Sequence, residues 1–134
     1  MRLAVLLLPL MLLVIASLSS VNAAAYLIVP LKPLSDRNVF YGGSVLDVKF
    51  KLLDPQGALV TDATATLWVD GSPAVGRGQF NTGNFFTIQG QNYVFKLDTA
   101  PLSAGFGSPL HTLTIVASVD GNEVATASFS IALH

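Results

Sequence analysis

The stretch Val45-Leu46-Asp47-Val48-Lys49-Phe50-Lys51-Leu52-Leu53, residues 45–53, decides the fold class because apolar and polar side chains alternate along it. Successive side chains of a β-strand point to opposite faces, so this alternation is typical of a strand between a core and water. The apolar face holds Leu46, Val48, Phe50 and Leu52, and the charged face holds Asp47, Lys49 and Lys51. Residues 54–57, Asp-Pro-Gln-Gly, then end the strand with strong turn chemistry.

Similar patterns continue along the chain between turns rich in Gly, Pro, Asn and Asp, and no helical periodicity follows residue 25. We expect further strands at residues 63–69, 85–88, 91–97, 111–119 and 124–133. Asp120-Gly121 is the strongest hairpin signal, and glycine-rich 74–84 is expected to hold a short edge strand and loops. Pro30 restricts the strand-like residues 26–31 to a sheet edge. About seven strands in about 110 residues predict an all-β, immunoglobulin-like β-sandwich.

Alternate residues of these strands are expected to form the core. They are Ala63, Ala65, Leu67, Val69, Tyr93, Phe95, Leu97, Leu113, Ile115, Ala117, Val119, Ala125, Ala127, Phe129, Ile131 and Leu133. Val94 and Lys96 are expected to face outward. This apolar set is large enough for a domain that folds independently.

The first 23 residues are predicted to be a helical signal peptide. Met1-Arg2 supplies a positive start, residues 3–15 are an uncharged apolar run, and small residues suit cleavage after Ala23 or Ala25. The apolar run is shorter than the roughly 20 residues of a membrane span, which favours a cleaved leader over a retained anchor. We therefore expect a secreted, extracellular or cell-surface protein without a stable membrane span after cleavage. Residues 24–41 would be an N-terminal strand and linker, and 42–134 the sandwich.

Charge and cysteine content exclude several classes of partner. Loss of Arg2 with the leader leaves six Lys and Arg against eight Asp and Glu, a net charge of −2. Nucleic acid is not expected as a partner because the chain has no basic stripe for phosphates. The absence of cysteine removes a disulfide framework and thiolate metal ligands, which is typical of a bacterial or archaeal envelope protein rather than a small animal one.

Two stretches carry a resemblance to a known family. Residues 43–63, Gly-Ser-Val-Leu-Asp-Val-Lys-Phe-Lys-Leu-Leu-Asp-Pro-Gln-Gly-Ala-Leu-Val-Thr-Asp-Ala, resemble prokaryotic immunoglobulin-like surface domains of the PxKF type. The segments 81–86, 93–97 and 102–105 are similar to the downstream part of such domains. Asp47 stands where the family has its proline. The resemblance spans about residues 42–133 and implies a non-catalytic extracellular module, usually part of a larger surface protein.

No residue pattern predicts an enzyme. Histidine is the usual general base, but neither of the two histidines, His111 and His134, lies in a nucleophile elbow or an HExxH motif. Turn carboxylates could hold calcium, and the candidates are Asp54, Asp62, Asp70 and Asp120. Aspartate is also an ordinary turn residue, and no calcium-loop spacing is present. We expect no catalytic residue, no cofactor and no resident metal.

Aromatic residues give one candidate binding surface. Trp68 falls on the outward face with Thr64 and Thr66, and one of Phe85 and Phe86 must point away from the core. Flat exposed rings bind polysaccharides by stacking, whereas the alternative is that the 74–84 segment covers Trp68.

The N-terminal strand gives the other candidate. Its apolar residues are Tyr26, Leu27, Ile28, Val29 and Leu31. It either completes its own sandwich or acts as a donor strand in a neighbouring copy, and repetition of that contact would build a filament. The leading hypothesis is a non-enzymatic extracellular structural or binding module of a prokaryotic cell surface, with a protein partner or self-association through an edge strand. The alternatives are a donor-strand filament subunit and a carbohydrate-binding protein.

Overall fold

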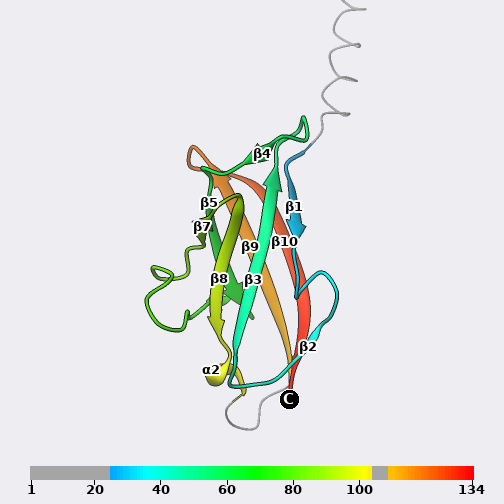
Figure 1. The fold of residues 1–134 in the computed structure, drawn as a ribbon, viewed down its shortest axis with the longest axis vertical. Helices are drawn as coiled ribbons and strands as arrows, with labels where there is room; N and C mark the ends of the chain where they lie inside the picture. Colours follow the sequence, from blue (N-terminus) through cyan, green and yellow to red (C-terminus); the bar gives the residue numbers. More distant parts are fainter. Residues whose placement is uncertain (1–24, 104–108) are drawn as a thin grey trace, which may run out of the picture.

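Two five-stranded β-sheets make up most of the part of the chain that the structure, a computed structural model, describes: residues 25–103 and 109–134 (Figure 1). The signal peptide predicted for residues 1–23 lies outside the described residues. The expected all-β architecture is confirmed, with two sheets as in a sandwich. Within the described ranges, no helix has the length and apolar character of a membrane span.

The first sheet, sheet A, has the order β1-β3-β8-β7, and its neighbouring strands are antiparallel. Its strands are β1 (Leu27–Pro30), β3 (Val45–Leu53), β8 (Asn92–Asp98) and β7 (Thr87–Gln89), and β4 (Leu59–Val60) pairs with the end of β3. The alternating stretch 45–53 forms one strand over the expected residues. The four residues of β1 pair with the second half of β3 in the same chain.

The second sheet, sheet B, has the order β2-β10-β9-β5-β6. Its strands are β2 (Val39–Phe40), β10 (Asn122–Leu133), β9 (Leu110–Val119), β5 (Thr64–Val69) and β6 (Ser72–Pro73). β2 runs parallel to the end of β10, while the other pairs are antiparallel. A four-residue helix, α2 (Ala100–Ser103), follows β8.

Two Asp-Gly turns close hairpins in sheet B. Asp120 and Gly121 have φ of 52° and 80°, and Asp70 and Gly71 have φ of 51° and 84°. Positive φ at both central residues is the type I′ geometry that matches the twist of paired strands. The hairpin expected at Asp120-Gly121 is therefore confirmed, and its two-residue turn starts β10 at Asn122, two residues before the expected position.

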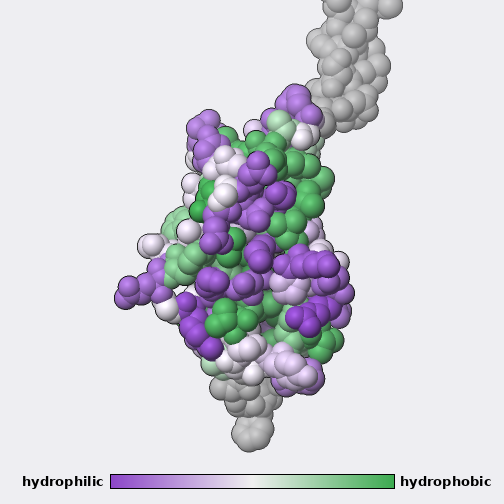
Figure 2. Space-filling model, in the orientation of Figure 1, coloured by the Kyte–Doolittle hydropathy of each residue, from purple (hydrophilic) through white to green (hydrophobic). Residues whose placement is uncertain are grey.

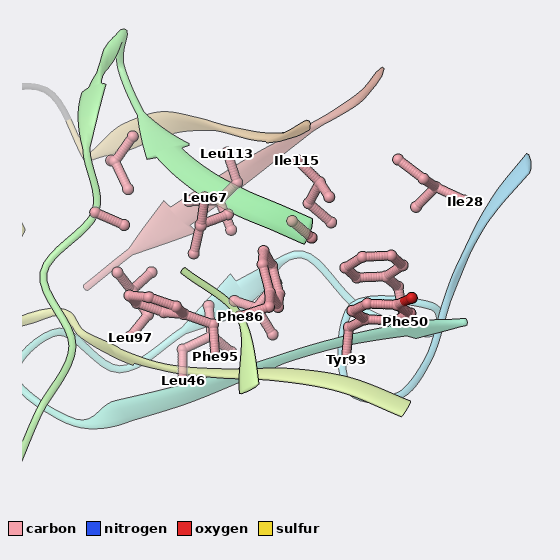
Figure 3. Close-up of a cluster of buried hydrophobic side chains, with 14 of the residues drawn as sticks. Ile28, Leu46, Phe50, Leu67, Phe86, Tyr93, Phe95, Leu97, Leu113 and Ile115 are labelled. Carbon is pink, nitrogen blue, oxygen red and sulfur yellow. The ribbon is translucent and has the colours of Figure 1, made fainter. Parts of the chain in front are cut away.

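An aromatic cluster lies at the centre of the core between the sheets (Figure 3). The ring of Phe50 stacks on Tyr93 at a centroid distance of 4.7 Å and meets Phe86 edge to face at 5.0 Å. Phe86 in turn contacts Phe95 at 5.7 Å. Such ring pairs contribute about 0.5–1.5 kcal/mol each beyond the area they bury. Since the chain has no cysteine, this packing stabilises the domain without help from a disulfide.

The hydroxyl of Tyr93 is a polar group inside this core. It donates to the carbonyl of Val60 at 2.7 Å and accepts from the amide of Ala63 at 3.2 Å. Burial raises the pKa of Tyr93. The hydroxyl thereby fixes the chain between β4 and β5 against sheet A.

We expect Tyr93→Phe to lower the free energy of unfolding by about 1–2 kcal/mol, because the carbonyl of Val60 and the amide of Ala63 lose their partner. Urea unfolding of the wild type and the variant measures the difference. Tyr41→Phe is the matched control, since Tyr41 is 74% exposed. Equal losses in the two variants would contradict a role for the Tyr93 hydroxyl.

Residues 74–87 cross between the two sheets along the side that carries β6 and β7. The amide of Ala74 donates to β5 at 3.0 Å, and the carbonyl of Val75 then accepts from Asp98 of β8 at 2.9 Å. The chain returns to sheet B, where the amide of Phe86 donates to β5 at 2.9 Å, before β7 joins sheet A. This segment connects the two sheets along one side of the sandwich.

Asn81 is the main polar bridge of this crossing segment. Its Oδ1 accepts from the amide of Lys96 at 2.9 Å, and its Nδ2 donates to the carbonyl of Val94 at 2.9 Å. Nδ2 also lies 3.1 Å from the carbonyl of Phe85 and 3.1 Å from Oγ1 of Thr87. One side-chain amide thus supplies the partners that a neighbouring strand would give to β8.

Val94 is a correction to the expected pattern. It was expected to face outward with Lys96, yet it is only 2% exposed. The loop around Asn81 is bonded to β8 at this point, and the ring of Phe80 lies 5.0 Å from Nζ of Lys96. Val94 shares the outward face with Lys96 as the alternation predicts, but it is buried there, because alternation assigns a face of the strand and does not reveal which loop lies over that face.

Candidate binding surface

The outer faces of the two sheets differ in charge. The outer face of sheet A carries most of the charged strand residues: Asp47, Lys49, Lys51, Lys96 and Asp98. Nζ of Lys96 lies 3.6 Å from Oδ1 of Asp47, and Asp98 is bonded to Arg77, which lowers the pKa of that carboxyl. In Figure 2, hydrophilic side chains cover much of the visible side, and hydrophobic patches lie between them, one of them toward the upper right, over β1. The charged side chains make the outer face of sheet A suited to contact with water.

The outer face of sheet B is almost uncharged. Residues directly opposite each other in antiparallel strands share a face, so the register of β5, β9 and β10 defines it. We call this surface the hydroxyl face: Thr64, Thr66, Trp68, Thr112, Thr114, Val116, Ser118, Thr126, Ser128 and Ser130. Glu123 at the hairpin end is the charged residue that the register of these described strands adds to it, and it accepts a hydrogen bond from Thr126 at 2.8 Å.

The two predicted surface aromatics, Trp68 and Phe85, both belong to this face. Phe85 forms an antiparallel bridge with Thr66, so its ring extends the outer face beyond β5, and it is 46% exposed. Trp68 is half-buried, and its Nε1 donates to Oγ1 of Thr66 at 3.0 Å. That bond fixes the indole along β5, and the ring keeps part of its surface exposed.

Phe86, the third predicted aromatic, is not part of the surface. It is 9% exposed, and its ring contacts Phe50 and Phe95 in the core. Neighbouring residues of an extended segment point to opposite sides, so the outward position of Phe85 requires the inward position of Phe86.

Cross-strand pairing arranges the face in rows. One row runs from Trp68 on β5 through Thr114 on β9 to Ser128 on β10, and a second runs from Phe85 through Thr66 and Val116 to Thr126. Sequence reasoning places Thr66 beside Trp68 but misses the hydroxyl members of these rows on β9 and β10. Their signal was the spacing of Thr112 with Thr114, and of Thr126 with Ser128 and Ser130, at every second residue of expected strands.

The predicted donor strand lies within its own chain in the structure. Ile28 is buried against the core, while Leu27 is 55% exposed at the edge of sheet A. Tyr26 and Val29 are half-buried beside them. The amide of Leu31 donates to the carbonyl of Lys49 at 2.9 Å, which extends the pairing past Pro30.

A groove of about 720 Å³ lies where this pairing ends, between the first half of β3 and β2. Because the carbonyl of Lys49 points toward β1, the main chain of Asp47, two residues away, points toward the groove. Partly exposed apolar residues line it, including Val39, Tyr41 and Val45. Charged residues, among them Lys32, Asp36 and Arg37, line it as well, so the edge of β3 is open beside a mixed lining.

His111 forms a structural pair with Asp70. Its Nδ1 lies 2.7 Å from Oδ2 of Asp70, whose Oδ1 accepts from the amide of Thr112 at 2.9 Å. These hydrogen bonds, with that to His111 the larger, lower the pKa of Asp70. Because Asp70 occupies the β5–β6 turn, the pair ties that turn to the start of β9. The other histidine, His134, packs on the ring of Tyr41 at 5.1 Å.

The lowered pKa of Asp70 makes the stability of the fold depend on pH in the acid range. Its hydrogen bonds stabilise the fold fully at a pH above the ordinary pKa of a carboxyl group, about 4. This stabilisation is lost as the pH falls further, through the lower pKa of Asp70 in the folded state. We expect the melting temperature of the wild type to exceed that of Asp70→Asn at neutral pH and to approach it in acid. Asparagine tolerates the positive φ of this turn, so the variant keeps the hairpin. A difference that stays constant with pH would contradict this expectation.

The turn carboxylates are spread over the described chain rather than gathered. Oδ1 of Asp54 accepts from the amides of Gln56 and Ala58, both at 2.9 Å, which is the usual role of a turn aspartate. In residues 25–103 and 109–134, no group of three or more His, Cys, Asp or Glu side chains could hold a metal ion.

The chain matches no protein-family model and none of the curated proteins with which it was compared. The resemblance to PxKF domains rests on the quoted motifs alone and stays a prediction.

Proposed function

We propose that the protein is a secreted, non-enzymatic extracellular module of a prokaryotic cell surface, with an immunoglobulin-like fold. The contrast between its two outer faces carries this proposal. A domain surrounded only by water gains little from a face almost free of charge, whereas a binding module uses such a face against a partner. The charged face of sheet A then remains toward solvent.

The sheet orders support the immunoglobulin-like part of the proposal. An immunoglobulin sandwich pairs strands A, B, E and D in one sheet and C, F and G in the other. Sheet A, ordered β1-β3-β8-β7, follows the first pattern, and β5-β9-β10 in sheet B follows the second. β6 then extends sheet B beyond β5, as an added strand does in the variable type.

The roles of the titratable residues support a non-enzymatic module. His111 and Asp70 are engaged in holding a turn, and Asp98 is bonded to Arg77 at the edge of β8. Catalysis by such groups would require a nucleophile or an attacked atom within hydrogen-bond reach of them.

Surface labelling of intact cells tests the location. The tag of a copy with a C-terminal tag is expected to bind an antibody added outside intact cells, because the leader exports the protein. A copy without residues 2–23 is the control, and its tag should bind antibody only after the cells are permeabilised. Absence of the full-length copy from both the cell surface and the medium would overturn the proposal.

A donor-strand filament is the second candidate, and the open edge of β3 favours it. β1 occupies only part of the length of β3, and a groove lies along the rest of that edge. A strand offered by another copy could add to such an edge by backbone pairing.

Disulfide trapping distinguishes a strand that stays in its own chain from an exchanged one. Val29 and Lys51 are opposite each other in β1 and β3, so Val29→Cys with Lys51→Cys places two thiols within reach in a chain without native cysteine. A filament gives a ladder of covalent oligomers on a non-reducing gel, whereas an independent module gives monomer. Val29→Cys alone is the control for random cross-linking.

A further inference from the structure

We infer that the hydroxyl face binds a neutral polysaccharide, with Trp68 and Phe85 as stacking rings at one side of the binding track. This inference rests on the proposed binding module and names the chemistry of its ligand.

Charge selects the class of ligand. From Thr64 to Ser130 the strands β5, β9 and β10 place no Lys, Arg or Asp on the hydroxyl face, and Glu123 lies at its end. An anionic polymer would find no cation to pair with there, and a cationic one would find a single carboxylate. An uncharged ligand has the smallest desolvation cost when it moves from water to this surface.

The aromatic side chains supply the apolar contacts. Trp68 and Phe85 lie at the β5 side of the face, and the hydrogen bond to Thr66 holds the indole in one orientation. A fixed ring binds the apolar face of a pyranose without a further loss of rotamer freedom. These rings mark the side of the track at which sugar units stack.

The hydroxyl rows supply the polar contacts. Each hydroxyl offers one donor and two acceptors, so the 3.2 Å contact between Thr114 and Ser128 leaves capacity for a ligand. Adjacent strands are about 4.8 Å apart, which is close to the length of one pyranose unit. A sugar chain that runs across the strands from Trp68 would therefore meet a hydroxyl on β9 and another on β10.

A sugar chain fits this face better than a protein partner does. Protein interfaces have an apolar, aromatic centre and a polar rim. On the hydroxyl face the rings lie at one side, and the central strand β9 carries three small hydroxyl side chains, Thr112, Thr114 and Ser118, beside Val116. A flat polar surface that offers repeated hydrogen bonds suits a ligand that is itself a repeated array of hydroxyl groups.

Fluorescence of the single tryptophan tests the inference, because a sugar stacked on Trp68 changes its emission. The mature protein would be titrated with laminarin, yeast mannan, hydroxyethyl cellulose and chitin oligomers, and with alginate as the acidic control. We expect a saturable change with at least one neutral glycan and none with alginate. A flat response to all the neutral glycans would overturn the inference.

Two variants locate the site without removing the fluorescent probe. Phe85→Ala removes an exposed stacking ring, and Ser128→Lys puts a charge in the first row. Each is expected to weaken binding of the responding glycan by at least about tenfold. Gln89→Lys, on exposed β7 of the other sheet, is the matched control and should bind as the wild type does. Equal weakening by Gln89→Lys would overturn the assignment.

Measurement of the molecular mass in solution distinguishes a glycan on the hydroxyl face from a second copy of the chain. If a second copy covers the hydroxyl face, the wild type is dimeric, Ser128→Lys is monomeric, and no glycan responds. That outcome overturns the inference. It leaves the proposed surface module intact, since that proposal fails only if the tagged protein is not found outside the cell.

Discussion

Phe50→Ala is expected to lower the free energy of unfolding by about 3–5 kcal/mol, the range for removing a buried ring from a core. Phe50 has no exposed surface and contacts both Tyr93 and Phe86. The substitution removes two ring contacts and leaves a cavity between sheets that no disulfide holds together. A domain of this size is stable by only about 5–15 kcal/mol, so the variant approaches the limit of folding.

Urea unfolding followed by the emission of Trp68 measures this loss. Phe50→Leu keeps most of the volume and is expected to lose less than Phe50→Ala, which keeps the prediction measurable if the alanine variant does not fold. Phe85→Ala is the matched control because its ring lies outside the core. A loss for Phe50→Ala no larger than that for Phe85→Ala would contradict the assigned centre of the core.

Asn81→Ala is expected to cost about 2–3 kcal/mol although it removes only a surface-loop amide. The variant leaves the amide of Lys96 and the carbonyl of Val94 without their partner, and it removes the side-chain bonds that help to hold the connecting segment on β8. Local opening of this side should accompany the loss. Hydrogen exchange at the amides of β8 and β7 should therefore accelerate more than exchange in β9.

Asn81→Asp distinguishes the contribution of the hydrogen bond that Asn81 accepts from that of the hydrogen bond it donates. Aspartate keeps the acceptor for the amide of Lys96 but puts a negative oxygen against the carbonyl of Val94. We expect a loss at neutral pH that is partly recovered in acid, when the carboxyl can donate. Asn92→Ala, at the start of β8, is the control. An unchanged stability for both Asn81 variants would rule out the bridge.

Local patterns were enough to predict the long strands and the hairpin. Alternation placed β3 over residues 45–53, because a half-buried strand must show its period in the sequence. Asp120-Gly121 located the β9–β10 turn because few other pairs accept positive φ at both residues.

Contacts between distant segments could not be predicted in this way. Nothing in residues 74–87 reveals that they cross from one sheet to the other, or that Asn81 replaces a strand partner. The same reason explains why Val94 is buried on an outward face. Burial there depends on a loop whose position no local period encodes.

The candidate site could be predicted only in part for the same physical reason. Trp68 follows from the parity of its own strand, whereas parity requires only that one of Phe85 and Phe86 faces outward. The rows that join them to Ser128 and Thr126 depend on the register between β5, β9 and β10, which is a property of the whole sheet.

The parallel pairing of β2 with β10 has a consequence for the order of events in folding. It joins Val39 to Ala132, so a chain that emerges N-terminus first keeps β2 unpaired until the last strand arrives. Contacts between residues so far apart in sequence form slowly because a long loop must close before they are made. We expect sheet A to be able to assemble while sheet B waits, and the domain to become protease-resistant only after residue 133 is free.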